Sequence, residues 1–125
     1  MGKTILVVDD DDAVRVSVSA ALKIKGGFNV LQAEDGLAAL ELAQEHHPDL
    51  IVSDVVMNHL DGFRMLETLK EYPDTADIPI ILMTMDTRNK KEWNKGAAIE
   101  YLAKGFTLNE LLGKVNSVLN TVPVV

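Results

Sequence analysis

Short apolar runs alternate along this chain with longer segments in which apolar residues recur at helical spacing. The runs are rich in β-branched residues and span Ile5 to Val8, Phe28 to Leu31, Leu50 to Val52, Ile78 to Met83 and Ile99 to Ala103. Such alternation is typical of βαβ units. The first, third and fourth runs are continuously apolar, which indicates strands covered on both faces and therefore a parallel sheet.

The segments between the runs predict crossover helices of about 10 to 16 residues. The clearest apolar stripe comprises Leu108, Leu111, Leu112, Val115, Val118 and Leu119. After the first run, Asp11 or Asp12 is placed to cap a helix, and Gly26 and Gly27 are placed to end it. We therefore expect five strands and five helices in strict alternation, packed as one doubly wound α/β sheet with helices on both faces.

Size and composition restrict the class of protein. The 125 residues fit one domain, spanning 1–125, and the net charge of -7 argues against a surface built mainly to bind nucleic acid. Cysteine is absent, which excludes disulfides and thiolate chemistry, and no apolar run approaches the roughly 20 residues of a membrane span. The N-terminus leaves no room for a signal peptide, so we expect a cytoplasmic protein without membrane or direct nucleic-acid contacts.

Charged and hydroxyl side chains follow the predicted strands, where α/β sheets place their functional groups. These residues are Asp9 and Asp10, Asp54, Thr84 and Lys104. Three converging carboxylates repel one another and need a cation, and an all-oxygen cluster suits Mg²⁺. A lysine and a hydroxyl opposite the carboxylates are what a transferring phosphoryl group requires.

These residues lie in motifs that resemble the receiver domain of two-component response regulators. The motifs are Ile5-Leu6-Val7-Val8-Asp9-Asp10-Asp11, Leu50-Ile51-Val52-Ser53-Asp54-Val55-Val56-Met57, Leu60-Asp61-Gly62, Met83-Thr84 and Tyr101-Leu102-Ala103-Lys104. The resemblance covers essentially the whole chain, in order. It implies a flavodoxin-like (βα)5 three-layer sandwich with a parallel five-stranded sheet of order 2-1-3-4-5.

The resemblance also implies roles for the residues at the strand ends. Asp54 is then the phosphoacceptor, and Asp9 and Asp10 hold Mg²⁺ together with Asp54 and the backbone carbonyl of Val56. Thr84 is the switch hydroxyl that bonds the new phosphoryl oxygen, and Lys104 pairs with that oxygen. Tyr101 matches an aromatic residue whose rotamer follows the threonine, although packing alone explains it equally well.

The implied function is phosphorelay signalling and not classical enzymology. A sensor histidine kinase or histidine phosphotransfer protein supplies the phosphoryl group to Asp54, and autodephosphorylation removes it. Phosphorylation then repacks a face made by the fourth helix, the fifth strand and the fifth helix, which contacts a downstream effector protein or domain. A homodimer formed on phosphorylation is a further candidate assembly. The chain is expected to be either a stand-alone receiver or the receiver of a longer regulator or hybrid kinase.

The sequence departs from the family pattern around the predicted site. Asn58 replaces a usual proline, which predicts a looser loop beside Asp54, and Met85 replaces a small residue, which predicts slow phosphoryl exchange. Gly105 replaces the proline that commonly forms a cis bond after the lysine. Either the bond is trans and Lys104 is placed differently, or strain is stored there. The polar stretch at 86–95 predicts a short, shifted or poorly ordered fourth helix.

Two other functions remain as alternatives. A phosphorylation-independent interaction domain with the receiver fold would account for the departures, but the intact set of site residues counts against it. A phosphatase of the haloacid dehalogenase type would use the Asp-x-Asp-x-Val pattern that starts at Asp10. That pattern is short, and the chain is too small for the usual cap, so this is the remote alternative.

Overall fold

The computed structural model describes residues 2–55, 62–84 and 99–121, and these contain one parallel five-stranded sheet. The strands are β1 (Thr4–Val8), β2 (Asn29–Ala33), β3 (Leu50–Asp54), β4 (Ile80–Thr84) and β5 (Ile99–Ala103). Their order is β2-β1-β3-β4-β5, and each neighbouring pair is parallel. The predicted fold class and strand order are therefore confirmed.

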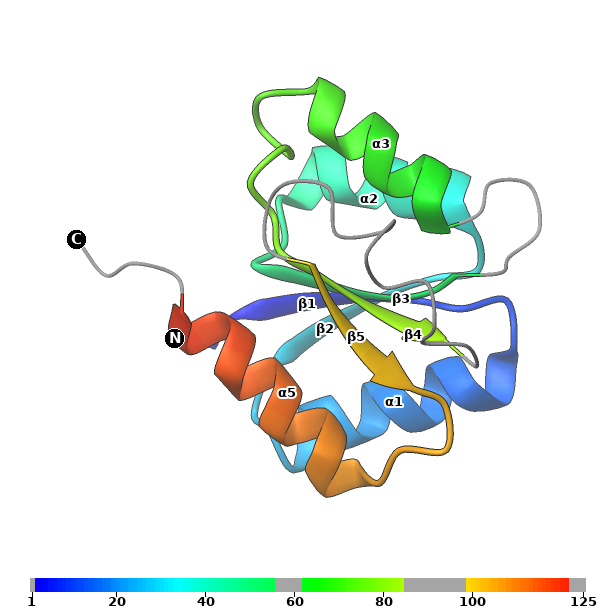
Figure 1. Cartoon of the computed structure of the whole chain (residues 1–125), viewed down its shortest axis with the longest axis vertical. Helices are drawn as coiled ribbons and strands as arrows, with labels where there is room; N and C mark the ends of the chain where they lie inside the picture. The colour runs from blue at the N-terminus through cyan, green and yellow to red at the C-terminus, as the bar shows by residue number, and fades with distance from the viewer. Residues whose placement is uncertain (1, 56–61, 85–98, 122–125) are drawn as a thin grey trace.

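Helices cover both faces of the sheet. They are α1 (Asp12–Ile24), α2 (Gly36–His46), α3 (Gly62–Glu71) and α5 (Leu108–Thr121). In Figure 1, α2 and α3 lie above the sheet and α1 and α5 lie below it. The predicted helix between β4 and β5 falls on residues outside the described ranges. No helix in the described part of the chain is long and apolar enough to cross a membrane.

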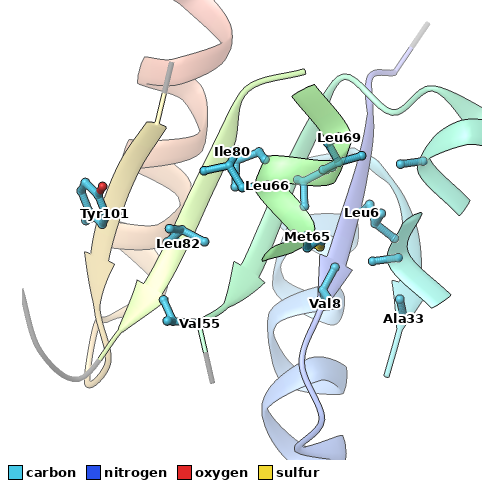
Figure 2. Close-up of a cluster of buried hydrophobic side chains, with 13 residues drawn as sticks. Leu6, Val8, Ala33, Val55, Met65, Leu66, Leu69, Ile80, Leu82 and Tyr101 are labelled. Carbon is cyan, nitrogen blue, oxygen red and sulfur yellow. The ribbon is translucent and has the colours of Figure 1, made fainter. Parts of the chain in front are cut away.

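The sheet separates two hydrophobic cores because successive side chains of a strand point to opposite faces. On β1, Leu6 and Val8 join the core beneath α2 and α3, whereas Ile5 and Val7 join the core beside α1 and α5. Figure 2 shows the first of these cores, with Met65 of α3 packed over β1 and β3. These four residues of β1 are 0% exposed, which explains the continuously apolar run.

Local side-chain chemistry fixes the start of α1. Of the two candidates, Asp11 is the N-cap, and its carboxylate accepts the N–H of Ala13 at 2.9 Å. Phe28 and Ile78 lie outside the strands predicted to contain them, and the strands extend one or two residues beyond the predicted runs, to Thr4, Ala33, Asp54 and Thr84. The N–H of Phe28 closes the C-terminus of α1 on the carbonyl of Leu22, so it is not free to join the sheet. Ile78 precedes a proline, which has no N–H to donate to the ladder.

Two glycines with equally open surroundings provide a test of backbone conformation in this fold. A Cβ at Gly105 or Gly113 would meet no heavy atom within 4 Å, but Gly105 has φ +97° and Gly113 lies inside α5. We expect Gly105→Ala to destabilise the protein by about 1 to 2 kcal/mol, and Gly113→Ala to stabilise it by about 1 kcal/mol. Urea unfolding measures both, and shifts of the same sign would contradict this account.

Candidate functional site

The carboxyl edge of the sheet brings together all the side chains predicted from the strand ends. Asp9 and Asp10 directly follow β1, Asp54 ends β3, Thr84 ends β4 and Lys104 directly follows β5. The register pairs Val8 with Ser53, Asp54 with Met83, and Thr84 with Ala103. Because all strands run in the same direction, their ends converge at one edge.

Three carboxylates form the acidic part of the site. One oxygen from each of Asp9, Asp10 and Asp54 lies within 4.8 Å of the other two. Asp9 is 0% exposed and Asp54 is 7% exposed, whereas Asp10 reaches solvent. Two of the three negative charges are thus largely removed from water, which is unfavourable unless a positive charge compensates them.

Lys104 supplies a positive charge opposite this cluster. Its Nζ lies 3.1 Å from Oδ1 of Asp54, and the same oxygen accepts the N–H of Val55 at 2.8 Å. The backbone N–H of Lys104 donates to the carbonyl of Thr84 at 2.8 Å, which ties the lysine to the end of β4. Within the described residues, the hydrogen bonds of the Asp54 carboxylate fall on Oδ1 and leave Oδ2 for other partners.

The peptide bond between Lys104 and Gly105 is trans, since the described part of the chain contains no cis bond. Of the two alternatives for this position, the trans bond is therefore the one found. Gly105 turns the chain with φ +97°, a conformation that glycine adopts readily. The lysine still reaches Asp54 without the usual proline. The other departures, at Asn58, Met85 and 86–95, lie outside the described residues.

The surroundings of Asp9 disfavour its charged form. Burial raises its pKa, and the charges of Asp54 and Asp10 raise it further, while a hydrogen bond from the N–H of Asp11 and the charge of Lys104 oppose this. That hydrogen bond, 2.9 Å long, occupies Oδ1. Oδ2 is buried and has no hydrogen-bond partner among the residues that the structure describes.

This donor set fits a hard divalent cation. The cluster offers carboxylate oxygens only, and one of them is a buried oxygen of Asp9 with its bonding capacity unused. Mg²⁺ prefers oxygen ligands and is held by one or two carboxylates with several waters, as an open cluster of this kind permits. The carbonyl of Val56, predicted as a further ligand, lies outside the described residues.

Thr84 is buried at the carboxyl edge of the sheet, and Tyr101 is buried in the middle of β5, opposite Leu82. Thr84 is 6% exposed, and Tyr101 is 9% exposed and belongs to the core beneath α2 and α3. Figure 2 shows Tyr101 on β5, at the margin of that core. Burial, and to a lesser extent the charge of Glu100, raises the pKa of the Tyr101 hydroxyl. The switch roles of the two residues stay predictions.

Two residues that support the site were not assigned a role from the sequence. A Cβ at Gly62 would lie 2.7 Å from the carbonyl oxygen of Asp54, so only glycine lets α3 begin against the end of β3. Arg15 on α1 donates to the backbone carbonyl of Asp9 at 3.0 Å. Its position one helical turn after the capping aspartates was the only available signal, because the bond itself depends on the docking of α1.

Comparisons with known proteins agree with this geometry. The family profile described as the response regulator receiver domain matches residues 5–116. The DNA-binding dual master transcriptional regulator RpaA of Synechocystis is 36% identical over 92% of this chain and 48% of its own length. The chemotaxis protein CheY4 of Vibrio cholerae has a TM-score of 0.87 and 33% identity, covering 94% of this chain and 99% of that one.

A third similar structure bears on the acidic cluster. The receiver domain of the sensor histidine kinase PA1611 from Pseudomonas aeruginosa has a TM-score of 0.86 at 26% identity, covering 97% of this chain and all of that one, and it has a magnesium ion coordinated in its active site cleft. The chain spans about half the length of the curated regulator RpaA. Since the family profile covers most of the sequence, the chain belongs to the response regulator receiver domain family.

Proposed function

We propose that this receiver accepts a phosphoryl group on Asp54 from a phosphohistidine, with Mg²⁺ held by the acidic cluster. One observation carries the proposal: an Asp54 oxygen lies within 4.8 Å of oxygens of Asp9 and Asp10, and Oδ1 of Asp54 lies 3.1 Å from the ammonium of Lys104. A nucleophilic carboxylate beside a cation site and a lysine is suited to phosphoryl transfer, where positioning and charge stabilisation supply most of the catalysis.

The hydrogen bonds of Asp54 distinguish its two oxygens. Oδ1 is held by the N–H of Val55 and by Lys104, which orients the carboxylate and directs Oδ2 toward the incoming phosphorus. An O–P bond forms at Asp54 as the P–N bond to the donor imidazole breaks, and the imidazole nitrogen leaves with the electron pair. Lys104 then faces the negative charge of the phosphoryl oxygens.

The cation site is formed by Asp9, Asp10 and Asp54, with the carbonyl of Val56 as a further ligand. When bound, Mg²⁺ supplies positive charge that offsets the carboxylates and the phosphoryl oxygens. The unpartnered oxygen of Asp9 and the magnesium-bound receiver of PA1611 support this assignment. Asp9 and Asp10 are oriented toward the cation site because the loop that carries them directly follows the buried strand β1.

Phosphorylation adds roughly two negative charges to a nearly buried edge of the sheet. The Thr84 hydroxyl and the Lys104 ammonium move to donate to the phosphoryl oxygens, and Tyr101 follows into the space left by Thr84. The segment between β4 and β5, β5 itself and α5 then form the changed interaction face. Phosphorylation can shift the equilibrium between the two conformations only by as much as the phosphoryl group stabilises one of them over the other, typically by a few kcal/mol.

The proposed partners are a histidine kinase or histidine phosphotransfer protein upstream and an effector protein or domain downstream. The relatives include a DNA-binding transcriptional regulator, a chemotaxis protein and the receiver of a sensor histidine kinase. The chain is accordingly a stand-alone receiver or the receiver of a longer protein, acting in the cytoplasm. Direct nucleic-acid binding by this domain is not part of the proposal, and dimerisation on phosphorylation is a further proposal.

The phosphoacceptor assignment predicts the intact mass of the protein after incubation with acetyl phosphate and Mg²⁺. We expect the protein to gain one phosphoryl group, located on Asp54 by peptide mapping, because Asp54 is nearly buried, contacts Lys104 and belongs to the cation site. The gain is lost in Asp54→Ala and on chelation of Mg²⁺.

Asp12→Asn is the matched control, since Asp12 is an exposed carboxylate near the site and should leave labelling intact. Absence of labelling in the wild-type protein would contradict the proposal and favour a phosphorylation-independent interaction domain. Labelling on Asp10 with turnover of a phosphate ester would instead favour the phosphatase alternative.

Asp9→Asn is expected to stabilise the metal-free protein by about 1 kcal/mol, because it removes a buried charge that two neighbouring carboxylates repel. The same substitution should abolish the stabilisation that Mg²⁺ gives to the wild-type protein. Thermal unfolding with and without Mg²⁺ measures both effects, and a metal-free Asp9→Asn protein less stable than wild type would contradict the account.

The raised pKa of Asp9 gives this effect a pH dependence. Between the ordinary value of 3.8 and the higher folded value, the folded protein binds more protons than the unfolded chain, so stability falls as pH rises through that window. The increase in stability of Asp9→Asn over the wild-type protein should therefore be largest at a pH above the folded pKa of Asp9 and smallest at a pH below its ordinary pKa.

A further inference from the structure

Arg15 is a nearly buried arginine that joins three parts of the fold behind the acidic cluster. Its side chain is 12% exposed although it carries a permanent charge. Nη1 donates to the backbone carbonyl of Asp9 at 3.0 Å, Nη2 contacts the carboxylate of Asp12 at 2.6 Å, and Nε donates to Oε1 of Gln32 at 3.2 Å. The guanidinium thus links the β1–α1 loop, the first turn of α1 and β2.

These contacts hold the Asp9 backbone from both sides. The N–H of Asp9 donates to the carbonyl of Ala33 at 3.2 Å, and its carbonyl accepts from Arg15. The carbonyl of Asp9 and the N–H of Asp10 belong to one planar peptide unit. A hydrogen bond that holds this carbonyl therefore also fixes the orientation of the Asp10 backbone N–H.

Asp10 depends on this backbone more than Asp9 does. The Asp9 carboxylate is buried and accepts the N–H of Asp11 at 2.9 Å, so it has its own anchor. The Asp10 side chain is exposed, and in the described part of the chain it makes no hydrogen bond or ion pair. Its distance from Asp9 and Asp54 is thus set by the peptide that Arg15 holds.

We propose that Arg15 is a positioning residue for the cation site, acting through the Asp9 carbonyl to orient Asp10 toward Asp9 and Asp54. This inference rests on the proposed Mg²⁺ site and goes beyond it, because Arg15 itself has no place among the ligands. A guanidinium can serve three acceptors in fixed directions, whereas a lysine ammonium at the same place cannot.

Simple charge arguments predict the opposite effect. A cation near a metal site repels the metal, so removal of Arg15 would strengthen Mg²⁺ binding if only its charge mattered. Loss of positioning weakens binding, as is general for groups that orient metal ligands. The sign of the change therefore separates the two roles.

The test is a titration of the unphosphorylated full chain with Mg²⁺, followed by the amide NMR shifts of residues around the cluster. For Arg15→Ala and Arg15→Lys we expect the Kd for Mg²⁺ to rise about tenfold, the low end of the range for residues that orient metal ligands. Arg15→Lys preserves the charge and removes the fixed donor geometry, so both variants should weaken binding.

Two control variants exclude other causes. Asp12→Asn breaks the ion pair of Arg15 but leaves its bond to the Asp9 carbonyl, so the Kd should stay close to wild type. Leu111→Ala removes a side chain that is 0% exposed in the core beside α1 and α5 and lowers stability without touching the loop. At a temperature where it remains folded, its Kd should also match wild type.

The outcomes separate this inference from the proposed function. Wild-type protein that binds no Mg²⁺ would overturn the cation site itself. Wild-type binding with tighter or unchanged binding in Arg15→Ala would overturn only the positioning role. Equal weakening in Leu111→Ala would also overturn it, because loss of stability would then explain the effect.

Discussion

The chemistry of this site depends on the repulsion between three carboxylates, two of which the fold holds largely out of water. Asp9 is fully buried and Asp54 nearly so, and both lie with Asp10 in a cluster whose nearest oxygens are within 4.8 Å of one another. Two unit charges at such a separation repel by about 3 to 4 kcal/mol at an effective dielectric constant of about 20. Lys104 compensates part of this charge through Asp54, and the remaining negative charge favours a bound cation.

The strand order explains why this charge is concentrated at one point. β1 lies between β2 and β3, and the helices that follow β1 and β3 lie on opposite faces of the sheet. The chain therefore diverges above and below the sheet where β1 and β3 end, which leaves their carboxyl ends accessible between the connections. Asp9, Asp10 and Asp54 lie at these two ends, beside Lys104 from the far edge strand.

The sequence predicted the strands, the strand-end residues and, through the receiver resemblance, the strand order. Continuous burial makes β1, β3 and β4 apolar throughout, so these strands were recognisable without knowledge of their neighbours. The bounds at Phe28 and Ile78 were wrong because an apolar side chain does not reveal whether its backbone joins a helix end or a strand. The trans bond before Gly105 also needed the structure, since the residue types permitted either geometry.

The identities of the acidic, hydroxyl and lysine residues, and their positions after the strands, were determined by the sequence alone. Local chemistry also limited the cap of α1 to Asp11 or Asp12, because capping depends on neighbours along the chain, and the structure selected Asp11. The tertiary structure decided which carboxylate oxygens remain without partners, how far Asp9 is removed from water, and that Arg15 holds the Asp9 carbonyl. These properties depend on distances between residues that only packing brings together, and desolvation and hydrogen bonding act over a few ångströms in space whatever the separation in sequence.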